Sequence, residues 1–129
     1  MILPALDFIL DDGVVLLDLA ARVEAEDLDI SSLPRWRQLL GDLARLRSGW
    51  RPEPRILERA PRLDHWSVGE PQDFGLVRLL GTVTGHPLLP DHRVVTTSPL
   101  VALETQRGTW ARTVSRFYVL HASQRERER

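Results

Sequence analysis

The sequence contains no cysteine, no lysine and no long apolar run. Without cysteine the chain forms no disulfide and offers no thiolate to a metal, and nothing in it requires an oxidising compartment. No run of about 18 apolar residues is present, and acidic residues follow the N-terminus where a signal peptide carries basic ones. These features predict a cytoplasmic protein that neither spans a membrane nor carries a recognisable export signal.

All 17 basic residues are arginine. The coding bias of a GC-rich genome explains such a composition without any functional cause. Its physical consequence holds in either case. Every cation in the chain is a planar guanidinium, which binds carboxylate or phosphate in a bidentate manner and stacks on aromatic rings.

Charge is segregated along the 129-residue chain, although its formal net charge is only -1. This length and balance fit one globular domain, and the net charge gives no reason to invoke nucleic acid. Residues 1–34 carry eight acids against one arginine, whereas residues 35–62 carry eight arginines against three acids. Two interpretations are open: the segments pair with each other in the fold, or one of them meets a partner of opposite charge.

The start of the chain is compatible with a helix and with a hairpin. Asp12-Gly13 lies between two apolar runs, which is typical of a β-hairpin turn. Apolar residues from Val15 to Val23 also recur at helical spacing. We favour a helix over residues 14–26 and keep the hairpin as the alternative within residues 5–26.

A second helix is predicted in the basic segment. Ser32 is suited to its N-cap, Pro34 to its first turn and Gly49 to its end. Between them apolar residues recur at steps of three and four, while the arginines fall mostly off that stripe. This pattern predicts an amphipathic helix with a basic outer surface. A third, shorter helix is expected between Pro52 and Pro61.

From Leu76 onward β-branched and aromatic residues alternate with turn signals. We expect three strands, over residues 75–85, 92–104 and 109–121, with a close turn between the last two. Because Pro99 cannot donate to a ladder, the second strand is expected to be an edge, bulged or broken at that point.

The order of these elements predicts an α+β fold, in which N-terminal helices pack on a small C-terminal antiparallel sheet of about three strands. The whole chain forms a single domain in this prediction. Its parts are an acidic N-terminal segment (1–30), an Arg-rich helical segment (31–62), an antiparallel β meander (75–121) and a flexible tail (122–129).

The third predicted strand suggests a distinctive surface. Residues alternate sides in an extended strand, so Trp110, Arg112, Arg116 and Tyr118 fall on one face. Such a face stacks bases and pairs phosphates in proteins that bind single strands. It is also the bulky face that a small sheet needs for its core, with the arginine stems reaching out to acids. If the aromatic rings are buried, the two arginines are structural ties.

The sequence supplies no catalytic constellation. It lacks a Gly-x-Ser-x-Gly elbow, a P-loop and a dinucleotide-binding glycine pattern. Nothing positions the Asp64-His65 pair against a nucleophile. His86, Asp91 and His92 share one loop and are candidate metal ligands, although turn residues of this kind need no metal. We predict no enzyme, cofactor or metal.

Three motifs occur in the second half of the chain: Gly85-His86-Pro87, Thr97-Ser98-Pro99-Leu100, and Ala111-Arg112-Thr113-x-Ser115-Arg116-x-Tyr118-x-Leu120. Together they resemble the C-terminal signature of an uncharacterised family of short bacterial proteins that carry a domain of unknown function. The resemblance spans residues 76–120 and implies no activity. It implies a free-standing bacterial protein of the accessory sort that is found on mobile elements.

We predict a non-catalytic interaction or regulatory protein that binds a protein or nucleoprotein partner through Arg-rich and acidic surfaces. An inhibitor of host defence carried by a mobile element fits this prediction. Direct nucleic-acid binding is the alternative, and a small metal-dependent enzyme is the second alternative. The predicted partner-binding residues are Trp110, Arg112, Arg116 and Tyr118 on the strand and Arg35, Arg37, Arg45 and Arg47 on the helix.

Overall fold

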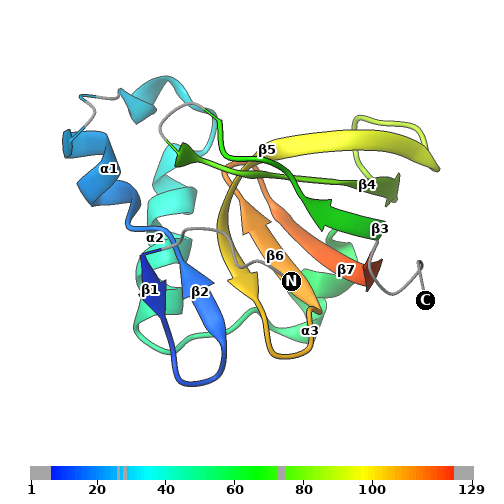
Figure 1. The fold of residues 1–129 in the computed structure, drawn as a ribbon, viewed down its shortest axis with the longest axis horizontal. Helices are drawn as coiled ribbons and strands as arrows, with labels where there is room; N and C mark the ends of the chain where they lie inside the picture. The colour runs from blue at the N-terminus through cyan, green and yellow to red at the C-terminus, as the bar shows by residue number, and fades with distance from the viewer. Residues whose placement is uncertain (1–6, 26, 28, 73–74, 124–129) are drawn as a thin grey trace.

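The computed structural model describes residues 7–25, 27, 29–72 and 75–123 (Figure 1). The first two residues of the predicted tail (122–129) belong to a strand that ends at Ser123, and the rest of that tail and the first six residues of the acidic segment lie outside this part of the chain. The elements in chain order are β1 Phe8–Ile9, β2 Val14–Leu16, α1 Leu19–Ala25, the 3-10 turn η1 Ile30–Ser32, α2 Trp36–Arg47, α3 Pro54–Arg59, β3 Arg62–Val68, β4 Arg78–Thr84, β5 Arg93–Glu104, β6 Trp110–Thr113 and β7 Phe117–Ser123.

Five of the strands close into a barrel (Figure 1). From β3 to β7 each strand pairs antiparallel with the next, and β7 returns to lie parallel to β3. A closed meander with an odd number of strands must contain one parallel pair, because the strand directions alternate. The β1–β2 hairpin continues from the edge of β5 outside the ring.

The predicted α+β fold of helices on a three-strand sheet is therefore wrong. The structure is mostly sheet, at 37% strand, with a closed barrel, additional strands and few helices. β3 lies where no strand was predicted. A register shift between Asp64 and Ser67 places Leu63 and Trp66, three residues apart, in the core and so removes the period of two that marks a strand.

Two cores lie on the two sides of the barrel wall. The inner core contains Val15, Leu63, Trp66, Val77, Leu79, Val83, Leu100, Leu103, Ala111, Tyr118 and Leu120. The outer core joins α2 to β2, β5 and β6 and contains Val14, Leu16, Leu17, Leu19, Leu39, Leu43, Leu46, Val101, Ala102 and Trp110. A register shift between Leu100 and Ala102 lets β5 contribute consecutive residues to the outer core. The barrel wall thus carries α2 on its outside.

The N-terminal segment contains a hairpin and a helix. β1 and β2 form the hairpin, with Phe8 opposite Leu16 and Gly13 in the left-handed region at φ 85°. The favoured helix over residues 14–26 is wrong at its start, because β2 pairs with β5 there. α1 begins only at Leu19, after the hairpin has ended.

α2 is the predicted amphipathic helix and buries Leu39, Leu43 and Leu46. Its predicted N-cap is wrong, since Ser32 belongs to η1 and Arg35, in the left-handed region, precedes the first turn. Gly49 follows the helix at φ 107°, as the sequence predicted. None of the described helices is long and apolar enough to cross a membrane.

β5 is the strand that contains Pro99. The register of its pairing with β4 shifts between Thr96 and Pro99, and its pairing with β6 begins at Leu100. Of the three alternatives for this proline, the bulged strand is the one that the structure has.

Gly81 offers a test of the close approach between β3 and β4. A Cβ at Gly81 would lie 2.7 Å from Leu63 Cγ and 2.9 Å from the carbonyl oxygen of Asp64. We expect Gly81→Ala to lower the free energy of unfolding by about 1–3 kcal/mol, because core atoms must move. Gly41→Ala on the open face of α2 is the matched control. There the added methyl meets nothing within 4 Å, so a gain of about 0.5–1 kcal/mol is expected. Urea unfolding measures both, and equal effects would contradict this packing.

Candidate functional site

The predicted strand over residues 109–121 is two strands. β6 ends at Thr113, β7 begins at Phe117, and the chain reverses in the three residues between them. In the resulting register Arg112 lies opposite Phe117, and Ala111 lies opposite Tyr118. Trp110 belongs to the outer core and Tyr118 to the inner core. The single Arg-aromatic face predicted from strand alternation does not exist, because the turn places these residues on both sides of the wall.

Three of the predicted partner-binding residues have buried side chains. The exposed fractions are 6% for Trp110, 3% for Arg112 and 4% for Tyr118. Residues this deeply buried present no surface for stacking bases. Of the two interpretations of this segment, the one that fits Trp110 and Arg112 is a core face whose arginines bind groups within the fold.

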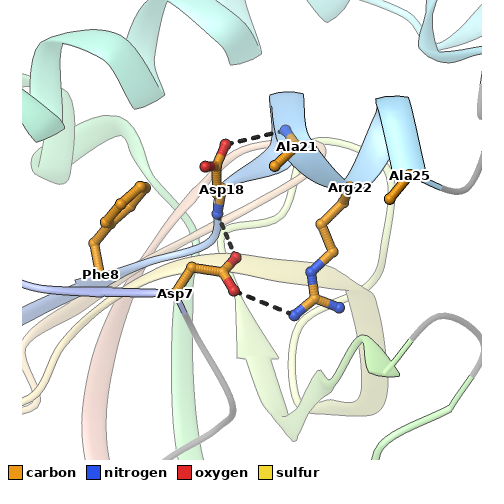
Figure 2. A pocket seen from close by; sticks show the side chains of 6 residues that line it. All are labelled: Asp7, Phe8, Asp18, Ala21, Arg22 and Ala25. Atoms are coloured by element: carbon orange, nitrogen blue, oxygen red, sulfur yellow. Dashed lines mark hydrogen bonds and ion pairs between the residues drawn. The ribbon is translucent and has the colours of Figure 1, made fainter.

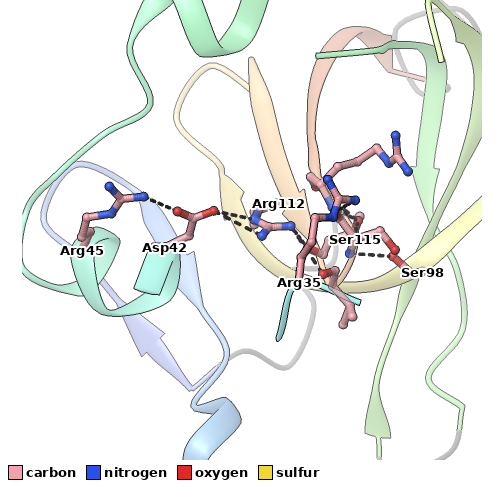
Figure 3. A network of polar contacts seen from close by, with 9 residues as sticks. Arg35, Asp42, Arg45, Ser98, Arg112 and Ser115 are labelled. Atoms are coloured by element: carbon pink, nitrogen blue, oxygen red, sulfur yellow. Dashed lines mark hydrogen bonds and ion pairs between the residues drawn. The ribbon is translucent and has the colours of Figure 1, made fainter. Parts of the chain in front are cut away.

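Arg112 ties the barrel to α2 through a buried ion pair (Figure 3). Its Nε and Nη2 each lie 3.2 Å from Oδ2 of Asp42, while Arg45 pairs with the other carboxylate oxygen. Arg112 Nη1 also donates to the carbonyl oxygen of Thr113 at 2.7 Å. Burial lowers the pKa of the Arg112 guanidinium, and the neighbouring Asp42 charge acts in the opposite direction.

A signal for Asp42 was present in the sequence. Asp42 lies three residues after Leu39 and four before Leu46, and this spacing places it beside the leucines that α2 buries. A carboxylate at such a position needs a cation from the facing element. The all-arginine composition left many possible partners for it, so the sequence could not identify Arg112.

The remaining predicted helix residues form an exposed surface, which we call the α2 basic face: Arg35, Arg37, Arg45 and Arg47. Three of its guanidinium groups stack on rings. The guanidinium carbon of Arg37 lies 5.2 Å from the ring centroid of Trp36. The corresponding distance is 4.5 Å between Arg45 and Trp50, and 3.9 Å between Arg47 and Phe8. Stacking orients a guanidinium and leaves its in-plane N–H donors available.

Most of the α2 basic face lacks a counter-charge within the described residues. Arg37 and Arg47 make no ion pair there, and Arg35 donates only to the carbonyl oxygen of Ser115, at 3.0 Å. Arg45 shares the Asp42 carboxylate with Arg112. Arg37 and Arg47 on this face therefore keep hydrogen-bond donors that no described residue accepts.

Part of the acidic segment is used within the fold. Arg51 binds both carboxylate oxygens of Asp12, at 2.6 and 2.9 Å, and this contact lowers the pKa of that carboxyl. Asp18 accepts a hydrogen bond from the backbone N–H of Ala21 at the start of α1, and Asp29 caps η1. Among the described residues this bidentate bridge joins the acidic segment to the basic one, and Arg37 and Arg47 form no ion pair there.

A shallow hollow of about 340 Å³ beside α1 is lined by Asp7, Phe8, Asp18, Ala21, Arg22 and Ala25 (Figure 2). Its polar groups form hydrogen bonds and an ion pair with one another. Asp7 accepts a hydrogen bond from the backbone N–H of Asp18 at 2.6 Å and lies 3.6 Å from Arg22. The hollow is therefore part of the local framework of α1 and presents no cluster of free groups to a ligand.

The β6–β7 turn is braced from several sides. The buried hydroxyl of Thr113 accepts a hydrogen bond from the backbone N–H of Arg116 at 3.3 Å, and the backbone N–H of Ser115 donates to the Ser98 hydroxyl at 3.2 Å. Arg35 and Arg112 donate to carbonyl oxygens of the same turn. Arg116 thus leaves a turn whose backbone is fixed on both sides.

The loop with the candidate metal ligands is held by its own hydrogen bonds. His86 Nδ1 accepts from the backbone N–H of Leu88 at 3.0 Å, and Asp91 accepts from that of Gly85 at 2.8 Å. Among the described residues no three His, Cys, Asp or Glu side chains lie together as a metal site requires. Nothing in this loop therefore supports the metal-dependent alternative.

The carboxylate of Asp64 is engaged with residues other than His65. Asp64 binds Arg62 and His121, whose Nδ1 lies 2.9 Å from Oδ1, while His65 stands at φ 52° beside the register shift of β3. His121 was not a sequence candidate, because its strand pairs in parallel with β3, a strand that the sequence did not reveal. Among the described residues, Asp64 binds His121 and Arg62, and neither of these contacts includes a nucleophile.

Comparison with family models matches residues 36–128 to a family of unknown function (DUF6634). The match begins with α2 and includes the three motifs that carry the predicted resemblance. The resemblance to an uncharacterised family is thereby confirmed. No curated protein sequence and no solved structure matches the chain.

Proposed function

This chain belongs to a family of unknown function (DUF6634), and from its own surface chemistry we propose that it is a non-catalytic interaction protein. Its contact surface is the α2 basic face, and its ligand is an acidic segment of a protein partner. The observation that carries the proposal is the stacking of three guanidinium groups on Trp36, Trp50 and Phe8 without a full set of carboxylate partners.

Stacking supports binding in two ways. It restricts the arginine side chains before the partner arrives, so less conformational entropy is lost on association. It also leaves the fork of N–H donors free for bidentate contact with carboxylates. Complementary charge raises the association rate as well, since the local potential steers an acidic segment toward the face.

An acidic protein segment fits this surface better than a nucleic acid does. The net charge of -1 provides no general attraction for a polyanion of high charge density. The aromatic platform predicted for base stacking is buried, and the rings near α2 are covered by arginines. For an inhibitor of host defence we also propose the α2 basic face as the contact surface. Much of the acidic segment is not free for this role, because its carboxylates cap helical turns or bind Arg51 within the fold.

Two double variants with equal net charge test the proposal. Arg37→Gln with Arg47→Gln removes two charges from the α2 basic face, whereas Arg93→Gln with Arg107→Gln removes two exposed charges elsewhere. We expect a labelled poly-glutamate peptide at low ionic strength to bind the first variant about fivefold more weakly than the wild type, since each exposed ion pair contributes about 0.5 kcal/mol. Fluorescence anisotropy measures the three affinities.

The control outcomes are distinct. The Arg93/Arg107 variant is expected to bind poly-glutamate as the wild type does, and the wild-type affinity is expected to fall with added salt. Equal weakening of both variants would show a net-charge effect and contradict the proposal. Tighter binding of a single-stranded or duplex oligonucleotide through the same two arginines would replace it with the nucleic-acid alternative.

A further inference from the structure

Arg116 carries a buried donor without a partner. Its Nε is excluded from solvent and makes no hydrogen bond to the described residues. A buried unpaired donor costs about 1–3 kcal/mol, and such groups are rare in folded proteins. The Thr113 hydroxyl forms hydrogen bonds with the backbone N–H and carbonyl oxygen of Arg116, so the Arg116 side chain extends from a well-fixed turn.

Two further side chains accompany Arg116: Tyr118, which follows it by two residues, and His86, which packs against Tyr118. His86, from the loop between β4 and β5, stacks obliquely near Tyr118 of β7, with ring centroids 6.4 Å apart. Burial makes the largest contribution to the pKa of both groups, lowering that of His86 and raising that of Tyr118, and the positive charge of Arg116 acts on each in the lowering direction. Residues from two segments, the β4–β5 loop and the start of β7, therefore meet at one corner of the barrel, which we call the Arg116 corner: His86, Arg116 and Tyr118.

The free polar groups of this corner are donors. His86 Nδ1 accepts from the backbone N–H of Leu88, so the neutral ring carries its proton on Nε2. Burial lowers the pKa of His86 and raises the pKa of Tyr118, which keeps the imidazole neutral and the phenol protonated near pH 7. The Tyr118 hydroxyl makes no hydrogen bond to the described residues, and no described carboxylate pairs with Arg116.

We propose that the Arg116 corner binds a phosphate group through Arg116, His86 and Tyr118. Arg116 supplies the charge and a planar fork of donors, and the two rings supply one donor each. A phosphate offers acceptor oxygens in several directions and therefore meets donors that arrive from separate segments, whereas a carboxylate offers two in one plane. The residues of this site are distinct from Arg37 and Arg47, so the proposal does not rest on the proposed function.

Titration of the full-length protein tests the site. Inorganic phosphate, phosphoserine, adenosine monophosphate and acetate are added at constant ionic strength, and amide and imidazole chemical shifts are followed by NMR. We expect saturable shifts at Gly85, His86, Arg116 and Tyr118 with inorganic phosphate and none with acetate. Binding of inorganic phosphate and phosphoserine alike marks a site for the phosphate group itself, while preference for adenosine monophosphate marks a nucleotide as its source.

Single substitutions identify the residues involved. Arg116→Gln is expected to weaken phosphate binding by about tenfold or more, and Tyr118→Phe, which removes one oxygen, by about threefold to tenfold. Arg93→Gln, a change of the same kind at an exposed position, is expected to leave the affinity unchanged. If Arg116→Gln perturbs the fold, Tyr118→Phe and His86→Asn still test the site. Unsaturable shifts, equal shifts with acetate, or unchanged affinity in both Tyr118→Phe and His86→Asn would overturn the proposal.

Discussion

Replacement of Arg112 by alanine is expected to lower the free energy of unfolding by about 3–5 kcal/mol, because it removes the buried cation of Asp42 and leaves this buried carboxylate only the largely exposed Arg45. Asp42 is 2% exposed and Arg112 is 3% exposed, so water cannot replace the lost partner. The change also frees the carbonyl oxygen of Thr113 from its hydrogen bond with Arg112. If Arg112 lay on an exposed binding face of the strand, the same substitution would weaken partner binding and leave the free energy of unfolding almost unchanged. Urea unfolding followed by far-ultraviolet circular dichroism distinguishes the two.

Two control variants define the origin of this effect. Arg45→Ala removes the other partner of Asp42. Because the Arg45 side chain is 56% exposed, this change is expected to lower the free energy of unfolding by less than about 1 kcal/mol. The double variant Asp42→Leu with Arg112→Met removes both charges and is expected to restore most of the lost stability, since an apolar pair of similar volume replaces a buried ion pair without a stranded charge. A double variant as unstable as Arg112→Ala would contradict this account.

Trp110→Ala is expected to lower the free energy of unfolding by about 3–5 kcal/mol, because it opens a cavity in the outer core. Trp110 packs with the leucines of α2 and meets Phe117 edge to face, with ring centroids 5.9 Å apart. The same substitution at Trp36, which lies under Arg37 and outside both cores, is the matched control. There we expect a cost below about 1 kcal/mol. Thermal and urea unfolding measure both changes, and similar losses at the two positions would contradict the assignment of Trp110 to the core.

Elements with an uninterrupted pattern were predictable from the sequence. The apolar stripe of α2, the glycine that follows it and the prolines around α3 all describe local structure that the chain adopts. The same holds for β4, β5 and the turn at residues 105–108, where turn residues separate two apolar runs. In each case the residues that form the element are neighbours in sequence, so local spacing contains the information.

The closed barrel was not predictable, because two local irregularities hide its strands. The register shift between Asp64 and Ser67 removes the alternation of β3, and the turn at residues 114–116 contains neither glycine nor proline. The turn is instead held by contacts from elsewhere, with Ser98 and Arg35 bound to Ser115. Because residues distant in sequence stabilise this chain reversal, the three residues of the turn contain no sequence pattern that predicts it.

The candidate site was predictable only in part. The exposed arginines of α2 followed from its helical stripe, and the structure confirms that they lie on the outer surface. Their stacking on Trp50 and Phe8 depends on the folding of other segments against α2. The corner that joins His86 to Arg116 and Tyr118 likewise required the barrel, because these residues come from different strands and loops.

The central claim is that the α2 basic face, and not the strand over residues 109–121, is the surface that binds an acidic partner. The most direct measurement is the ratio of the dissociation constants of the Arg37/Arg47 and Arg93/Arg107 double variants for the same poly-glutamate peptide. The two variants have equal net charge, so the ratio reports position alone. A ratio of about five, with the Arg93/Arg107 variant equal to the wild type, is the predicted result. A ratio of about one would contradict the claim.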